Sequence, residues 1–136
     1  MNIDDALIEM FRLLEKHNVY PSRQFMRDIK SLVKTDIKKF IKDFTKNFLR
    51  VNLKEHKKFE RLGTTPSQNK RLNGNALFRY EYRNTSNLRC IYMVLNVNNT
   101  NETRLLCAFN EDGNKHSGKN SYDLNIERAI RIYEQK

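Results

Sequence analysis

The sequence is poor in the residues that several common kinds of functional site require. Its 136 residues include four glycines, two prolines, two cysteines and no tryptophan. The glycines are scattered, which excludes a Gly-rich phosphate-binding loop. Two cysteines and three histidines show no ligand spacing, so we expect no zinc site, no other metal and no cofactor. Cys90 and Cys107 lie in apolar strand patterns, which predicts buried free thiols.

Long hydrophobic runs are also absent. No apolar stretch approaches the roughly 20 residues that cross a bilayer. The first residues are acidic, unlike the basic start of a secretory signal. We therefore expect a cytoplasmic protein that does not enter a membrane. At 136 residues, a single domain over residues 1–136 is the simplest expectation.

Positive charge, in contrast, is abundant. Lysine and arginine number 26 against 16 acidic residues, giving a formal net charge of +10 and an isoelectric point near 9.8. Such a chain attracts polyanions, and nucleic acid is the commonest polyanion that a soluble basic protein meets. The alternative is a basic protein with no nucleic-acid role.

The first half of the sequence predicts helices. Apolar residues recur at helical spacing over residues 3–16, and again from Ser22, a suitable N-cap, to Phe48. This second stretch is either one helix or two, with a break at residues 35–36. Residues 53–62 predict a further short amphipathic helix, and the Gly- and Asn-containing residues 63–75 predict a loop.

Alternating residues in the second half predict β-strands over 77–82, 88–94 and 104–109. A hairpin between the first two strands places all their large even-numbered residues on one face, suited to packing against helices. The pairs in that register are Tyr82 with Leu88, Tyr80 with Cys90, and Phe78 with Tyr92. The opposite face would be open, with Arg79 on it and Glu81 directly across from Arg89 as an ion pair.

Polar loops at 96–103 and 110–119 and a helix over 122–133 complete the predicted elements. The expected fold is therefore α+β, with a small antiparallel sheet of three to four strands. This sheet would pack against N-terminal helices and a C-terminal helix. Residues 1–50 would form a helical extension to a core of residues 51–136.

Several short motifs, in this order, resemble the RelE/ParE toxin superfamily, in particular its HigB-like, phage-associated branch. The motifs are Leu72-Asn73-Gly74, Phe78-Arg79-Tyr80, Arg89-Cys90-Ile91-Tyr92, Leu105 through Phe109, and Ile126 through Tyr133. The family usually begins with a β-strand before a helix pair, whereas this chain is expected to open on a helix of its own.

The resemblance implies a metal-independent endoribonuclease that cleaves messenger RNA on the ribosome and inhibits growth. It also implies a cognate antitoxin as partner, and a homodimer is an open alternative to a single chain. In the chemistry of such a hydrolase, a base takes the ribose 2′-OH proton, cations hold the phosphate, and an acid protonates the leaving oxygen.

The resemblance also assigns candidate residues. The catalytic candidates are Arg89, His116, Glu111 and Glu81, and the RNA- or phosphate-binding candidates are Arg79, Arg71, Lys115, Lys119 and Tyr122. Glu81 could be the base or only the partner of Arg89. His116 is a candidate acid because histidine titrates near neutral pH, and its alternative is an ordinary loop residue.

Two other functions remain open at this point. One is a non-enzymatic inhibitor like the gyrase-directed ParE branch. The other is a phage-encoded nucleic-acid-binding protein that has the fold without the chemistry.

Overall fold

The protein is α+β in the computed structural model, which describes residues 3–33, 36–55, 61–82, 88–111 and 122–135. In these ranges, five helices accompany a mixed sheet with the strand order β1-β5-β4-β3-β2. The predicted fold class is confirmed, although the sheet has five strands rather than three to four. The elements are α1 (Ile3–Glu15), β1 (Val19–Pro21), α2 (Arg23–Leu32), α3 (Ile37–Glu55), β2 (Arg61–Leu62), α4 (Pro66–Arg71), β3 (Leu77–Tyr82), β4 (Leu88–Val97), β5 (Thr100–Asn110) and α5 (Tyr122–Glu134).

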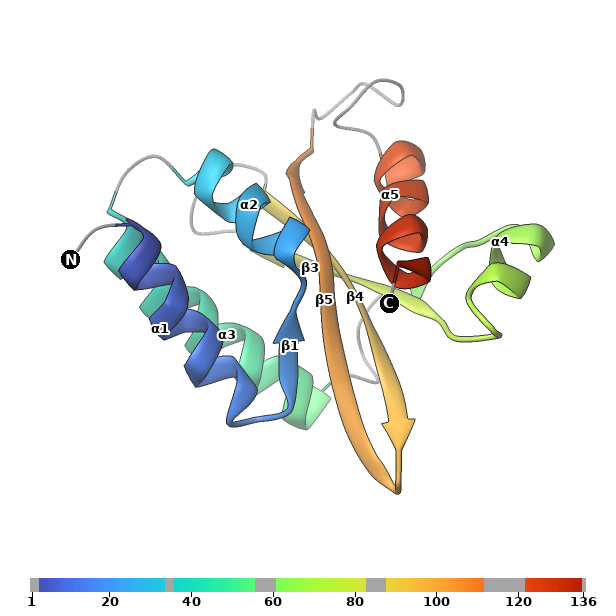
Figure 1. Ribbon diagram of the computed structural model, residues 1–136, viewed down its shortest axis with the longest axis horizontal. Helices are drawn as coiled ribbons and strands as arrows, with labels where there is room; N and C mark the ends of the chain where they lie inside the picture. Colours follow the sequence, from blue (N-terminus) through green and yellow to red (C-terminus); the bar gives the residue numbers. More distant parts are fainter. Residues whose placement is uncertain (1–2, 34–35, 56–60, 83–87, 112–121, 136) are drawn as a thin grey trace.

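The sheet lies between two groups of helices (Figure 1). Helices α1, α2 and α3 cover one face, and α5 covers part of the other, with α4 beside it. The break left open near residues 35–36 is present, because α2 ends at Leu32 and α3 begins at Ile37.

The central hairpin has the register that the alternation predicts. Phe78 pairs with Tyr92, Tyr80 with Cys90, and Glu81 with Arg89. Because successive side chains of a strand point to opposite faces, this register separates aromatic from charged residues.

The aromatic face of the sheet forms the larger core. Phe44 and Phe48 of α3 stack at 5.6 Å, and both rings contact Tyr80 edge-on. Edge-to-face pairs of this kind each contribute about 1 kcal/mol beyond the area that they bury. The first 50 residues therefore supply much of one core, together with the sheet.

The other face is partly covered rather than open. Ile91 and Met93 are fully buried against Ile130 of α5. The expectation of an open face was wrong for this part, since helix α5 shields the apolar positions. On the same face, the charged residue Arg79 lies against Tyr122, the first residue of α5.

The two cysteines are buried free thiols, as predicted. Cys90 belongs to the core under the N-terminal helices and Cys107 to the core under α5. Burial raises the pKa of Cys107 to about 12 and that of Cys90 well above its usual value, so both remain protonated at neutral pH.

Three expected elements differ from the structure. Where a separate helix over 53–62 was expected, residues 53–55 continue α3 and Arg61–Leu62 form β2, and residues 56–60 lie outside the described part of the chain. The expected loop at 63–75 contains α4, which Thr65 and Gln68 begin with a reciprocal capping box. The expected loop at 96–103 is a tight hairpin, in which Asn98 and Asn99 have φ of 53° and 66° and join β4 to β5.

Strand β1 was not expected. It pairs in parallel with β5, Val19 opposite Thr103, at the edge of the sheet. The contact with β5 extends one residue past β1. Ser22, the N-cap of α2, donates a hydrogen bond of 2.7 Å from its Oγ to the carbonyl of Leu106.

Candidate functional site

Four charged residues meet on the face of the sheet that α5 covers only in part. Arg79 and Glu81 are two positions apart on β3 and so share a face. Arg89 lies opposite Glu81 and also opposite Phe109, and Glu111 follows Phe109 by two positions. The strand register alone therefore places these side chains together. Arg79, Glu81, Arg89 and Glu111, with Tyr122, are called the arginine–glutamate cluster below.

Arg89 is at the centre of this cluster. Its Nε donates a hydrogen bond of 2.9 Å to Glu111 Oε2 and lies 3.8 Å from Glu81 Oε1. Glu81 Oε1 is also 3.6 Å from Arg79 Nη2, so the carboxylate of Glu81 lies between two guanidinium groups. Only 14% of the Arg89 side chain is exposed, which strengthens these contacts relative to a surface ion pair.

Tyr122, the first residue of α5, completes the cluster. Its ring packs edge-on against Phe109 at 5.1 Å, and the guanidinium of Arg79 lies 5.4 Å from its centre. Burial raises the pKa of Tyr122 to about 12, and the carboxylates of Glu111 and Glu81 add to the rise while both arginines oppose it. The Tyr122 hydroxyl is therefore protonated at neutral pH. It has no hydrogen-bond partner among the residues that the structure describes.

This arrangement suits proton transfer next to an anion. The Glu81 carboxylate is a potential proton acceptor, and the guanidinium groups on either side of it can hold a phosphate. The phenol of Tyr122 adds a buried hydrogen-bond donor at the cluster. The two carboxylates, however, balance the charges of the two arginines, so an incoming phosphate must compete with Glu111 and Glu81.

Arg71 lies elsewhere. It binds Glu127 at 2.7 Å and Glu134 at 2.6 Å, which fixes α4 against α5. Glu127 and Glu134 are five and twelve residues beyond Tyr122, roughly 8 and 18 Å along the helix at about 1.5 Å per residue. Arg71 therefore belongs to a helix–helix contact and is not brought to the cluster.

The remaining candidates lie outside the described residues. Lys115, His116 and Lys119 fall within 112–121. Glu111 precedes this segment and Tyr122 follows it, and both belong to the cluster.

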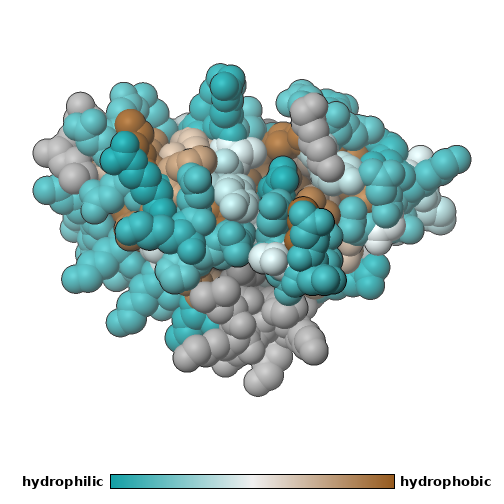
Figure 2. Space-filling model, turned by 60° about the horizontal axis from the view of Figure 1, so that its bottom comes forward, coloured by the Kyte–Doolittle hydropathy of each residue, from teal (hydrophilic) through white to brown (hydrophobic). Residues whose placement is uncertain are grey.

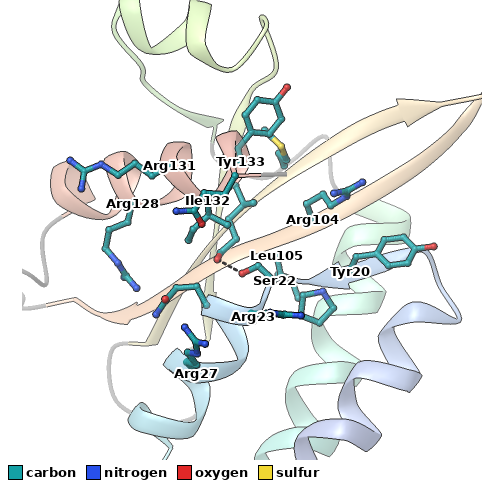
Figure 3. A pocket seen from close by; sticks show the side chains of 15 residues that line it. Tyr20, Ser22, Arg23, Arg27, Arg104, Leu105, Arg128, Arg131, Ile132 and Tyr133 are labelled. Carbon is teal, nitrogen blue, oxygen red and sulfur yellow. Dashed lines mark hydrogen bonds between the residues drawn. The ribbon is translucent and has the colours of Figure 1, made fainter.

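A second group of cations was missed in the sequence. Arginines from α2, β5 and α5 line a groove of about 610 Å³ at the β1 edge of the sheet (Figure 3). Their spacing was a usable signal, because Arg23 and Arg27 are four apart and Arg128 and Arg131 are three apart, so each pair shares a helix face. The sequence did not indicate that α2 and α5, about 100 residues apart, would face each other.

The surface of the molecule is mostly hydrophilic on the side shown in Figure 2, where hydrophobic areas are small and separate. The large apolar side chains that the structure shows exposed are Ile8, Leu13, Val97 and Leu124. None of the helices in the described part of the chain is both long and apolar enough to cross a membrane.

Comparisons with known proteins gave no match: no family model fits the chain, and neither the curated proteins nor the solved structures include one that is significantly similar.

Proposed function

We propose that this chain is a metal-independent endoribonuclease of the kind that the resemblance to RelE/ParE toxins implies. The observation that carries the proposal is the position of Glu81, whose carboxylate lies between the guanidinium groups of Arg79 and Arg89. A base and two phosphate-binding cations are the groups that RNA cleavage without a metal requires.

The order of the elements supports the proposal. The resemblance implies a strand, a helix pair, antiparallel strands and a C-terminal helix. The chain has β1, then α2 and α3, then the antiparallel strands β3, β4 and β5, and finally α5, with the two-residue strand β2 and the short helix α4 inserted between α3 and β3. Helix α1 precedes this series.

In the proposed reaction, Glu81 takes the proton of a ribose 2′-OH, and the 2′-oxygen attacks the adjacent phosphorus. Arg79 and Arg89 stabilise the added negative charge on the phosphate oxygens. The bond from phosphorus to the 5′-oxygen then breaks as an acid, His116 in this proposal, supplies the proton. The products are a 2′,3′-cyclic phosphate and a 5′-hydroxyl, so no metal or external nucleophile is consumed.

The proposed substrate is messenger RNA, bound on the ribosome, and the proposed setting is the cytoplasm of a cell that also makes a cognate antitoxin. The net charge of +10 supports a polyanionic substrate.

The test is cleavage of end-labelled single-stranded RNA by the purified protein with a chelator present, with and without ribosomes. We expect cleavage that leaves a 2′,3′-cyclic phosphate and that 2′-O-methyl groups prevent. Glu81→Gln should lower the rate by about 100-fold or more, because a general base typically contributes that much. Arg12→Ala, which removes an exposed arginine on α1, is the matched control and should cleave normally. Absence of cleavage in every condition, or equal cleavage by Glu81→Gln, would contradict the proposal.

One observation favours a second candidate, an RNA-binding protein without catalytic activity. Glu111 binds Arg89 at 2.9 Å and so occupies the cation that should hold the phosphate. In that case RNA would bind with the salt dependence of phosphate contacts, and no product would form.

A further inference from the structure

The groove between α2 and α5 is separate from the arginine–glutamate cluster. One wall is the start of α2, with Arg23 and Arg27, and the other is α5, with Arg128 and Arg131. Arg104 extends from β5 at one side of the groove, beside Tyr20 of β1 (Figure 3). We call this surface the arginine groove.

The two walls of the arginine groove are held in place by Asp28. This residue of α2 accepts hydrogen bonds from Ala108 N on β5 at 2.9 Å and from Arg128 Nη2 on α5 at 3.0 and 3.1 Å. Only 11% of the Asp28 side chain is exposed. The groove is therefore preformed, and binding there need not order the helices first.

The groove carries excess positive charge. Among the described residues no acidic side chain lines it, although Arg128, Arg131 and Arg104 each have a carboxylate partner just outside. Arg23 and Arg27 are exposed and have no ionic partner in the described part of the chain. Two guanidinium charges on one helix face thus remain uncompensated, about 6 Å apart at the Cβ atoms.

The chemistry of the lining suits a phosphate. All five cations are arginines, whose planar fork binds a phosphate through two hydrogen bonds. Tyr20 offers an aromatic ring next to Arg104, as sites for unpaired bases do. A groove of about 610 Å³ has the size of a small-ligand pocket and admits roughly one or two nucleotides, not a duplex.

We infer that the arginine groove is a second binding site, which holds the phosphate groups of a single-stranded RNA away from the arginine–glutamate cluster. The inference rests on the proposed function only in taking RNA as the polynucleotide. The path from the groove is short, since Arg128 is six residues from Tyr122, roughly 9 Å along α5. A strand held in the groove would thus lie near the cluster.

The experiment measures binding of a labelled uridine dodecamer by fluorescence anisotropy at several salt concentrations. All proteins carry Glu81→Gln so that cleavage does not interfere. We expect Arg23→Ala/Arg27→Ala to weaken binding about tenfold at 0.1 M salt, a typical effect of two partly exposed charges. The slope of log K against log salt should become less steep by about 1.4, since each phosphate contact on a single strand contributes about 0.7. The control is Arg12→Ala, which should bind as the parent does.

Three results would overturn the inference. The first is a double variant with the affinity and salt slope of the Arg12→Ala control. The second is that a poly-glutamate peptide displaces the labelled RNA as effectively as an unlabelled RNA of equal charge does. The groove would then bind any polyanion, including an acidic protein segment. The third is displacement by uridine monophosphate as effectively as by the dodecamer, because the groove would then hold a free nucleotide.

Failure here is distinguishable from failure of the proposed ribonuclease. If Arg23→Ala/Arg27→Ala weakens RNA binding but the original chain never cleaves RNA, the groove is supported as a binding site and the ribonuclease proposal is contradicted. If RNA cleavage depends on Glu81 but Arg23→Ala/Arg27→Ala binds RNA normally, the ribonuclease proposal is supported and the groove is contradicted as a binding site.

Discussion

Tyr122 places a phenol beside both kinds of charge in the arginine–glutamate cluster. Its ring contacts Phe109 and lies below Arg79, while its hydroxyl has no partner among the described residues. The ring and the hydroxyl can therefore be separated by mutation. The ring packs under Arg79, and the hydroxyl is a buried donor that would reach a phosphate oxygen only after a local rearrangement of its surroundings.

We expect Tyr122→Phe to keep the fold and to slow RNA cleavage by about 10- to 100-fold, the effect of losing one hydrogen bond to a charged group. Tyr122→Ala should also lose the ring contacts and destabilise the protein. Cleavage rates and urea unfolding of both variants provide the measurement. An unchanged rate in Tyr122→Phe would exclude a role for the hydroxyl.

The raised pKa of Tyr122 also predicts a pH dependence of stability. Because the pKa is about 12 in the folded protein and near 10 when unfolded, its contribution is complete below pH 10 and is lost as pH rises to 12. Between pH 9 and 11, the free energy of unfolding of the original protein should fall by at most about 1 kcal/mol more than that of Tyr122→Phe, after allowance for the partial exposure of the side chain. The free energies of urea unfolding at these two pH values test the sign, and equal losses would contradict it.

Part of the cluster was predictable from the sequence. Alternation fixed the register of β3 and β4 and so placed Glu81 opposite Arg89. The binding of Arg71 to Glu127 and Glu134 was not predictable, because those partners lie 56 and 63 residues away on a different element. Local patterns contain no information on such contacts.

At the scale of elements, Asp28 joins three pieces of secondary structure. It connects α2 to β5 and α5 and also accepts a hydrogen bond from Gln24 at 2.8 Å. Asp28→Ala leaves a backbone N–H and a guanidinium without this partner. We expect it to lower the free energy of unfolding by about 2–4 kcal/mol.

Lys30→Ala is the matched control for Asp28→Ala. Lys30 also belongs to α2, but its ion pair with Asp4 is more than half exposed on both sides. Its loss should change stability by about 0.5 kcal/mol or less. If urea unfolding shows equal effects of the two substitutions, Asp28 is not a structural junction.

The hairpin between β4 and β5 offers a second test at this scale. Asn99 has φ of 66°, a region that glycine adopts without strain. We expect Asn99→Gly to stabilise the protein by about 0.5–1 kcal/mol and Asn99→Ala to destabilise it by a similar amount. Thermal unfolding of the two variants provides the measurement, and the reverse order would contradict the turn geometry.

The elements that the sequence analysis missed share a cause. Strand β1 has three residues and is defined by its pairing with β5, so no alternation of its own could reveal it. The expected loop at 96–103 is polar because β4 and β5 extend past the core, where both faces of a strand tolerate polar residues. The polar composition of residues 96–103 reflects their exposure to solvent and does not indicate their backbone conformation.

For the whole molecule, helices α1, α2 and α3 contribute to the packed core. Leu14 of α1 is fully buried in the core that includes Phe44 of α3, whereas 37% of the neighbouring Leu13 is exposed. We expect Leu14→Ala to cost about 2–4 kcal/mol of stability and Leu13→Ala less than about 1 kcal/mol. Unfolding of the full chain should also remain a single transition. A separate early transition in Leu14→Ala would instead indicate an independent N-terminal extension.

The most direct test of the central claim is inducible expression in bacteria, with growth followed and RNA 5′-ends mapped for the original chain, Glu81→Gln and Arg12→Ala. We expect the original chain and Arg12→Ala to arrest growth and to produce new internal 5′-ends in messages, and Glu81→Gln to do neither. Normal growth with intact messages in all three strains would contradict the ribonuclease proposal, and so would arrest with intact messages.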